Sequence, residues 1–305
     1  MIDLGRLRAL HAVAVHGSIG AAASALGYTP SAVSQQLAKL ERETRTPLLE
    51  RRGRGVVLTD AALMLADTAG QVLGLVEQAE VTLEAQRGTP IGQVSVAAFA
   101  TVARGLLPLV LTDLAHRFPA MDVRLTEIDP LQAVDVVARG DVDLAVVQDW
   151  QNAPLTVPDG LSRAAIGEDT VDVLLPRGHP LAERDVLVPE ELGDQRWICQ
   201  QSGASCRDWL VRTLRAAHVE PDVAHEVVEY QTQTALISAG LGIGLLPRLG
   251  RGELPEDIVV RPMRPTPTRR LFALWRARAS RRPAITVLVD ALREHWDARD
   301  SADRV

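Results

Sequence analysis

The chain of 305 residues is poor in cysteine, with Cys199 and Cys206 as the only two. Such a pair cannot supply a disulfide scaffold, and no group of cysteines and histidines has metal-ligand spacing. No run of about 18 apolar residues is present, and residues 1–6 lack the apolar segment of an export signal. We therefore expect a cytoplasmic protein that does not span a membrane and holds neither a structural metal nor a cofactor.

Catalytic patterns are absent as well. The seven histidines stand apart from any neighbouring nucleophile, and Asp141 and Asp143 fall in an expected turn, where solvated carboxylates are ordinary. Gly240, Gly242 and Gly244 suggest a dinucleotide loop, but they follow an expected helix and lack the spacing of that fingerprint. These absences favour a binding protein over an enzyme.

Charge is distributed unevenly along the chain. The net charge of −6 would disfavour nucleic acid if it were uniform. Residues 1–60, however, contain eight basic and five acidic residues, so this segment is positive and the remainder is acidic. That division suits an N-terminal domain that contacts DNA phosphates, attached to a body that phosphates repel.

The first sixty residues predict three helices. Asp3 is placed to cap the first helix, which ends at Gly17, and Ser18 is placed to cap a short alanine-rich second helix. Thr29 and Pro30 have the residue types of an N-cap and a first helical position, so a third helix is expected from there to about residue 43. The order and the short turn are typical of a helix-turn-helix.

The third helix has one apolar and one polar face. Val33, Leu37 and Leu40 recur at intervals of four and three, which predicts a buried stripe. The opposite face carries short polar or methyl-bearing side chains that suit base edges and thymine methyls in a major groove, and its basic residues can reach phosphates. Taken alone, this pattern also fits a solvated amphipathic helix.

Residues 47–59 predict a hairpin that completes a winged helix-turn-helix. Two short apolar runs flank a turn rich in glycine and arginine, whose cations can enter a minor groove or contact the DNA backbone. A charged tip that only improves solubility is the alternative. The predicted DNA-binding residues of both elements are Ser18, Thr29, Pro30, Ser31, Ser34, Gln35, Ala38, Lys39, Arg42, Arg51, Arg52 and Arg54.

Residues 60–87 contain no proline and predict a helix about 42 Å long. Apolar residues recur along it in steps of three and four, as in a coiled coil, and a small N-terminal domain cannot cover a stripe of that length. We expect a second copy of the chain to cover it, with packing on the chain's own C-terminal domain as the alternative. The predicted dimerisation residues are Leu65, Ala69, Val72, Val76, Ala79 and Leu83.

Beyond a predicted hinge at residues 88–92, strand and helix patterns alternate in two sets, which predicts an α/β domain with two lobes. Expected strands are 93–99, 122–128, 142–148, 172–175, 197–200, 225–228 and 271–275, and expected helices are 104–118, 131–139, 205–217, 231–239 and 283–296. The predicted domains are residues 1–59, a linker of residues 60–88 and residues 89–305. Lobe I comprises about residues 92–161 and 267–297, and lobe II about residues 162–266.

The cleft between the lobes is the expected ligand site, because open α/β sheets bind ligands beyond the carboxyl ends of their strands. Free N–H groups at helix starts favour a carboxylate there. The candidate ligand residues are Phe99, Ala100, Thr101, Gln148, Ser202, Gly203, Ala204, Ser205, Gln231, Thr232 and Gln233. Phe99 favours an apolar or aromatic ligand if it lines the cleft, although a core role fits equally well. The expected ligand is therefore a carboxylate or an aromatic metabolite.

Over residues 12–61 the chain resembles the LysR-type DNA-binding domain almost position by position. The shared motif includes Gly17-Ser18, residues 21–23 (AAA), 29–36 (TPSAVSQQ), 47–51 (PLLER) and 58–61 (LTDA). Residues 140–145 (GDVDLA) and 239–247 (AGLGIGLLP) resemble the effector domain of the same family. Departures from the usual family residues occur at His11, Thr44, Arg45, Leu49 and Ala62, and none falls on the expected DNA-reading face.

The resemblance implies a transcriptional regulator with a winged helix-turn-helix, a long linker helix and a two-lobed α/β effector domain like the type 2 periplasmic binding proteins. It also implies a homodimer or homotetramer that binds a palindromic operator on double-stranded DNA. A small-molecule effector in the cleft would change the arrangement of the assembly and so modulate operator binding.

Two alternatives follow from the same resemblance. Peroxide-sensing members of the family carry a reactive cysteine in the region of Cys206, and a helix start beside Arg207 would lower the pKa of that thiol. A thiol-based redox regulator using Cys206 is therefore the first alternative, although buried and inert thiols are expected. A solute-binding protein is a more distant one, since it predicts an export signal and no DNA-binding domain.

Overall fold

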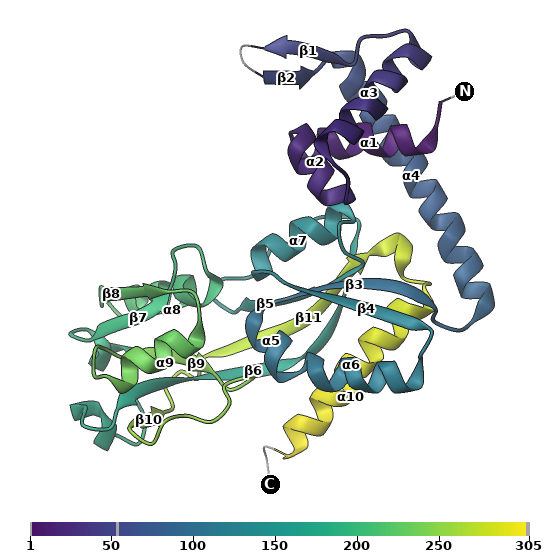
Figure 1. Ribbon diagram of the computed structural model, residues 1–305. Helices are drawn as coiled ribbons and strands as arrows, with labels where there is room; N and C mark the ends of the chain where they lie inside the picture. The colour runs from purple at the N-terminus through teal and green to yellow at the C-terminus, as the bar shows by residue number, and fades with distance from the viewer. Residues whose placement is uncertain (1, 53–54, 303–305) are drawn as a thin grey trace. The chain divides into compact units, whose positions relative to one another are not determined.

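The computed structural model describes residues 2–52 and 55–302 and divides into two compact units, Met1–Gly88 and Thr89–Val305 (Figure 1). In unit 1 the described elements are α1 (Leu4–His16), α2 (Ile19–Leu26), α3 (Pro30–Thr44), β1 (Leu49–Arg52), β2 (Gly55–Leu58) and α4 (Asp60–Arg87). The side chains of Asp3, Ser18 and Thr29 accept backbone N–H bonds in the first turns of α1, α2 and α3. The three predicted helix starts are therefore confirmed.

The three short helices of unit 1 share a core with the start of the wing. The predicted stripe of α3 is fully buried: Val33, Leu37 and Leu40. Glu41 ties the wing to α3, because its carboxylate accepts the backbone N–H groups of Leu48 and Leu49 at 2.8 and 3.1 Å. β1 and β2 then pair antiparallel, with Leu49 opposite Leu58. The predicted wing is present, and α3 fixes its base.

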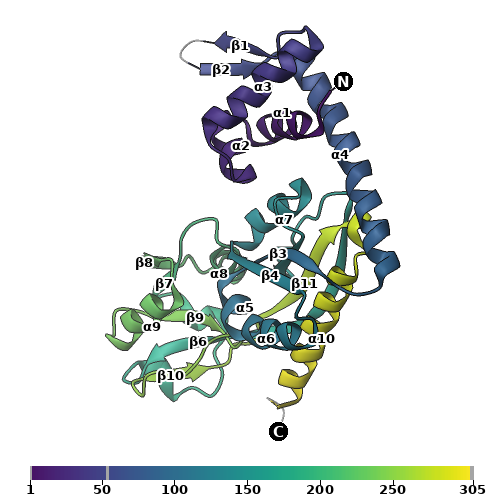
Figure 2. The same cartoon turned by 45° about the vertical axis from the view of Figure 1, so that its right-hand side comes forward.

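α4 covers the 28 residues predicted for the linker helix. It begins after Thr59, whose hydroxyl accepts the N–H of Ala62, and ends at Gly88, which adopts a φ of 70°. Both views show it extending well past the short helices of its own unit (Figure 2). Leu75 and Leu83 on its outer turns are 66% and 57% exposed. Of the residues predicted for dimerisation, Ala79 and Leu83 are exposed and Leu65, Val72 and Val76 are half-buried, whereas Ala69 is fully buried within the chain and cannot meet a partner.

Unit 2 alternates strands and helices as expected. Its strands are β3 (Gly92–Ala98), β4 (Met121–Glu127), β5 (Leu144–Trp150), β6 (Leu161–Pro176), β7 (Arg196–Gln200), β8 (Asp222–Val227), β9 (Gly244–Pro247), β10 (Ile258–Arg261) and β11 (Thr268–Arg276). Its helices are α5 (Ala100–Gly105), α6 (Leu107–Arg117), α7 (Pro130–Arg139), α8 (Ser205–Ala216), α9 (Tyr230–Ser238) and α10 (Pro283–Ala302), with short 3₁₀ turns at Pro180–Glu183, Pro189–Leu192 and Ala277–Ala279.

Lobe I is a sheet in the order β6-β11-β5-β3-β4, in which β3 lies parallel to β4 and β5. Helices cover both faces: α6 and α10 lie side by side on one face and α7 on the other (Figure 2). The alternation of side chains on β3 divides the core accordingly. Val96 and Ala98 join the cluster under α6 and α10, whereas Ala97 joins the cluster under α7.

β6 and β11 connect the two lobes. The first part of β6 pairs with β11 in lobe I, and residues 171–176 pair with β9 and β10 in lobe II. The sequence predicted only residues 172–175 of this 16-residue strand. Gly167 lies in the missed part, and a Cβ there would come within 1.8 Å of the Trp296 ring of α10. The glycine that weakens the strand pattern is thus required for the packing of α10.

Two further predictions are wrong in detail. Residues 104–118 form two helices instead of one, because Pro108 lies in the first turn of α6 and Leu106 separates it from α5. Gln148 does not close its strand, since β5 continues to Trp150 and pairs with β11 along its whole length. Phe99, at the end of β3, becomes the N-cap residue of α5.

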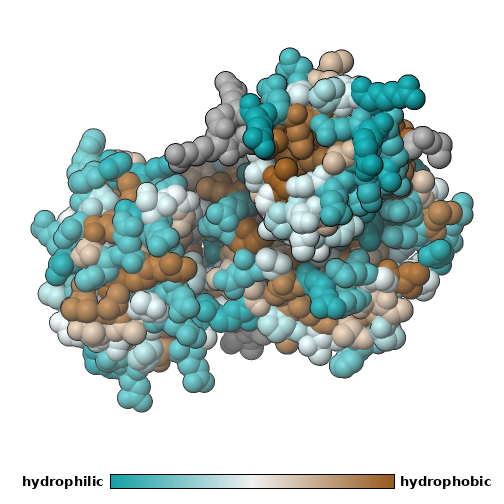
Figure 3. All heavy atoms as spheres, turned by 45° about the horizontal axis from the view of Figure 1, so that its top comes forward, coloured by the Kyte–Doolittle hydropathy of each residue, from teal (hydrophilic) through white to brown (hydrophobic). Residues whose placement is uncertain are grey.

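The face shown in Figure 3 is mostly hydrophilic. On the face shown in Figure 3, apolar residues form small patches separated by polar ones. Among the described residues, no helix is both long enough and apolar enough to cross a membrane.

Candidate functional site

The exposed face of α3 carries five of the twelve residues predicted to contact DNA. Ser31, Gln35, Ala38, Lys39 and Arg42 are exposed there. Their side chains lie opposite the buried stripe, so the helix presents short polar groups with basic residues toward its end. This is the composition that major-groove recognition requires.

Other predicted DNA contacts already have local roles. Ser18 and Thr29 are exposed, but their hydroxyls cap α2 and α3. Ser34 is half-buried, and its hydroxyl donates to the carbonyl of Pro30 at 2.9 Å. Because these hydroxyls are already bonded within their own helices, they suit contacts with the DNA backbone better than base reading.

The remaining predicted contacts lie at the start of α3 and in the wing. Pro30, at the start of α3, and Arg51, on β1, are exposed. Arg54 lies outside the described residues, and of Arg52 only its place in β1 is described.

A cavity of about 190 Å³ lies between the lobes of unit 2. Its walls come from the ends of β4 and β7, the residue after β8, the inner part of β5, and the starts of α5, α7, α8 and α9. The lining residues are Phe99, Ala100, Glu127, Ile128, Asp129, Pro130, Gln148, Gln200, Ala204, Ser205, Cys206, Val228 and Tyr230. The cavity therefore lies where strand ends and helix starts of both lobes meet.

The structure brings together five of the residues proposed from sequence: Phe99, Ala100, Gln148, Ala204 and Ser205. It leaves six out of the lining: Thr101, Ser202, Gly203, Gln231, Thr232 and Gln233. Gln233 faces the interior of lobe II, where its amide donates to the carbonyl of Ile198 at 2.6 Å and accepts from Gln200. Tyr230, three residues earlier on α9, lines the cavity where Gln233 was expected.

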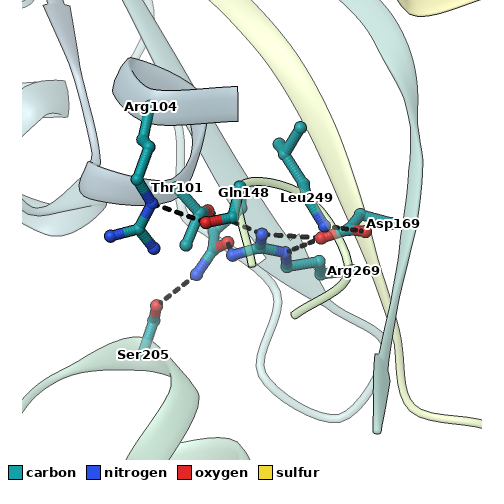
Figure 4. A network of polar contacts seen from close by, with 8 residues as sticks. Thr101, Arg104, Gln148, Asp169, Ser205, Leu249 and Arg269 are labelled. Carbon is teal, nitrogen blue, oxygen red and sulfur yellow. Dashed lines mark hydrogen bonds and ion pairs between the residues drawn. The ribbon is translucent and has the colours of Figure 1, made fainter. Parts of the chain in front are cut away.

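Sequence reasoning missed a buried arginine that organises the cavity. Arg269, at the start of β11, is fully buried, and its guanidinium forms an ion pair with Asp169 of β6 at 2.6 Å. It also donates to the side chains of Thr101, at 2.7 Å, and Gln148. Gln148 in turn donates to Ser205 of α8 at 2.8 Å (Figure 4). One hydrogen-bonded network thus joins lobe I, the connecting strands and lobe II.

Two aromatic rings of the cavity lining lie against arginine side chains. The ring of Phe99 packs on the Arg269 guanidinium, with 5.2 Å between ring centroid and guanidinium carbon, and belongs to the lobe I core. It therefore fills both of the roles left open by the sequence, core residue and cavity wall. The ring of Tyr230 faces the Arg104 guanidinium at 5.9 Å, and burial raises the pKa of its hydroxyl.

The two cysteines are buried, as expected. Cys206 lines the cavity, yet burial raises the pKa of its thiol to about 11, against the opposing charge of Arg269. Burial likewise raises the pKa of Cys199 to about 12. The lowered pKa expected for Cys206 from its helix start is therefore wrong, because desolvation outweighs the effect of nearby positive charge.

Two family models match the chain. The model of the LysR substrate binding domain matches residues 87–297, and that of the bacterial regulatory helix-turn-helix protein, lysR family, matches residues 4–63. The chain belongs to the LysR family of bacterial regulatory proteins. Among the described residues of this LysR-family protein, no group of three or more His, Cys, Asp or Glu is placed to hold a metal ion.

Relatives of this LysR-family protein match it over most of their length. It is 29% identical over 263 residues to a probable cat1 operon transcriptional activator of Acinetobacter lwoffii, with 84% of each chain covered. It is 26% identical to a hydrogen peroxide-inducible genes activator of Pectobacterium carotovorum subsp. carotovorum, with 96% of this chain and 97% of that one covered. A full-length OxyR variant from Pseudomonas aeruginosa matches with a TM-score of 0.69 at 24% identity, over 96% and 98% of the chains. These matches confirm the predicted fold.

Proposed function

We propose that this LysR-family regulator binds a specific DNA operator through α3 and the wing, and that a small molecule in the inter-lobe cavity of unit 2 controls this binding. The observation that carries the second part is the network from Thr101 through Arg269 and Gln148 to Ser205, because it connects both lobes at the wall of the cavity. A ligand that bonds to Gln148 or Ser205 would compete with the bond between them and so change how the lobes meet.

The proposed assembly is a homodimer or homotetramer on a palindromic operator. Exposed apolar residues of α4 support it, since a second α4 would remove them from water and place two recognition helices on one duplex. We assign residues 1–59 to DNA binding, 60–88 to the linker and dimerisation, and 89–305 to effector binding. A regulator of this kind acts on the chromosome in the cytoplasm and is not an enzyme.

A Gln35→Ala variant is expected to weaken operator binding by about 1 to 3 kcal/mol while leaving the fold intact, because an exposed amide on α3 is suited to a bidentate contact with adenine. Titration of labelled operator and of a random duplex at one salt concentration measures the difference.

Gln36→Ala is the matched control, since it removes the same side chain about 100° further around the helix. It should leave operator affinity nearly unchanged. An equal loss of affinity for operator and random duplex in Gln35→Ala would contradict a base-reading role.

The redox alternative is supported by the matching hydrogen peroxide-inducible genes activators of two bacteria. Thiols with pKa values of about 11 and 12 are almost entirely protonated near neutral pH and are poor nucleophiles. We therefore expect hydrogen peroxide to leave operator binding unchanged in the native protein and in Cys206→Ser alike, with Cys199→Ser as the matched control. If peroxide changes operator binding and Cys206→Ser abolishes that response, oxidation of the thiol, and not a bound metabolite, controls DNA binding.

A further inference from the structure

The charge of the cavity lining is acidic. Glu127 and Asp129 are the two charged residues in the lining, and no lysine, arginine or histidine accompanies them. Glu127 ends β4 and is exposed, while Asp129 is the N-cap of α7 and half-buried. A carboxylate ligand would therefore meet two full negative charges in this cavity.

The nearest basic groups are already engaged elsewhere. Arg269 packs against the Phe99 ring and is paired with Asp169, which compensates most of its charge, although it still acts on the Cys206 thiol in the lining. Arg104 lies over the ring of Tyr230 and donates to the backbone carbonyl of Gly250. Arg207, at the start of α8, forms an ion pair with Glu226 at 2.6 Å. Among the described residues, no ion pair involves Glu127 or Asp129.

A third carboxylate faces Asp129 from the opposite lobe. Asp208 lies in the first turn of α8, and the described residues give it no ion-pair partner. The pKa of Asp129 is raised, first by burial and in addition by the charge of Asp208, while its bond from the N–H of Leu131 acts in the other direction. Like charges on the two lobes repel each other across the cavity, and a positive charge between them would draw the lobes together.

The positive ends of helix dipoles at the cavity oppose the negative charge of these carboxylates, but more weakly. α8 and α9 begin there without a side-chain cap, and each contributes about half a positive charge at its N-terminus. Glu229 is the N-cap residue of α9, and Asp208 lies in the first turn of α8, so a full negative charge accompanies each of these helix starts. Among the described residues of the lining itself, the only full charges are those of two carboxylates, Glu127 and Asp129.

We propose that the effector of this regulator carries a positively charged nitrogen, an ammonium or amidinium group, attached to a small apolar body. The nitrogen lies by Glu127 and Asp129 in the cavity lining, with Asp208 of lobe II, outside the lining, close enough to act on Asp129, and the apolar body packs on Phe99, Ile128 and Tyr230. An organic cation suits the site better than a metal ion, because the described carboxylates do not converge as metal ligands. This inference rests on the proposed function, since it takes the inter-lobe cavity as the effector site.

The test compares three probes of one shape on the full-length protein by isothermal titration calorimetry: benzylamine, benzyl alcohol and benzoate. Benzylamine should bind at least about tenfold more tightly than the neutral alcohol, and benzoate should be the weakest of the three. A Glu127→Gln/Asp129→Asn double variant should lose most of this preference, while asparagine preserves the cap of α7. Asp185→Asn, a change of an exposed carboxylate in lobe II, is the control and should bind benzylamine like the native protein.

Several results would overturn the inference. The first is that benzoate binds more tightly than benzylamine, and the second is that benzylamine does not bind up to about 10 mM. The third is an unchanged preference in a double variant whose unfolding temperature equals that of the native protein. The comparison of the three probes on the native protein stands even if the double variant fails to fold. Failure of the proposed function has a separate sign, namely that the native protein prefers no duplex sequence in the operator titration.

Discussion

An Arg269→Met variant is expected to destabilise unit 2 by about 3 to 5 kcal/mol, the range observed when one partner of a buried ion pair is removed. Arg269 is fully buried, and Asp169 is 3% exposed. Without the guanidinium, the Asp169 carboxylate keeps the N–H of Leu249 at 3.0 Å as its described donor but has no opposite charge. Thr101 and Gln148 lose a partner in the same step. The uncompensated buried charge destabilises the fold more than the packing of the methionine side chain can stabilise it.

Tryptophan fluorescence during urea unfolding measures this loss selectively. All five tryptophans lie in residues 89–305: Trp150, Trp197, Trp209, Trp275 and Trp296. The midpoint of the fluorescence transition therefore reports on unit 2, and its shift at constant slope gives the change in free energy of unfolding.

Two matched variants separate burial from charge. Arg215→Met breaks an ion pair with Glu220 that is exposed on both sides, and it should leave the midpoint nearly unchanged because solvent screens exposed charges. Arg269→Met/Asp169→Leu removes both buried charges and should recover much of the loss, since a well-packed apolar pair often replaces a buried ion pair without cost. Equal effects of Arg269→Met and Arg215→Met would show that the buried network contributes nothing beyond surface electrostatics.

The same network marks the limit of what the sequence could predict in this protein. Arg269 contacts Asp169, Gln148 and Thr101, which precede it by 100, 121 and 168 residues, so no local pattern joins them. Strand alternation gave no help either. Leu271 on one face of β11 and Phe272 on the other are both buried, because helices cover both faces of the sheet. The alternation of residues along β11 therefore does not show whether the side chain of Arg269 is buried.

Unit 1 was predictable because its signals are local. Asp3, Ser18, Thr29 and the φ-permissive Gly17 each set a helix boundary through bonds within four residues. Ligand residues at helix starts were predicted less well. The sequence located the start of α9 but not which of its first residues would line the cavity. Tyr230 lines it, whereas Gln233 bonds to the carbonyl of Ile198 inside lobe II.

Gly105→Ala is expected to destabilise unit 2 by about 1 to 3 kcal/mol, although the same change in a helix normally stabilises. Gly105 ends α5, and a Cβ there would lie 2.4 Å from the backbone nitrogen of Gly250 and 2.7 Å from its Cα. Gly250 is equally constrained, with a φ of 68° and its own Cβ position 2.5 Å from the carbonyl oxygen of Thr101. Two backbones therefore meet without room for a methyl group.

To relieve that overlap, the segment around Gly250, which holds Asp169, would have to move. Leu249, next to Gly250, donates its N–H to Asp169, and Arg104 donates to the carbonyl of Gly250 at 2.5 Å. Gly178→Ala is the matched control in the same unit, because a Cβ there meets nothing within 4 Å. It should leave the fluorescence midpoint unchanged or raise it slightly, as expected when an unstrained glycine is replaced. If both alanine variants unfold at the same urea concentration, the close approach of α5 to Gly250 does not hold the lobes together, and the polar network must do so alone.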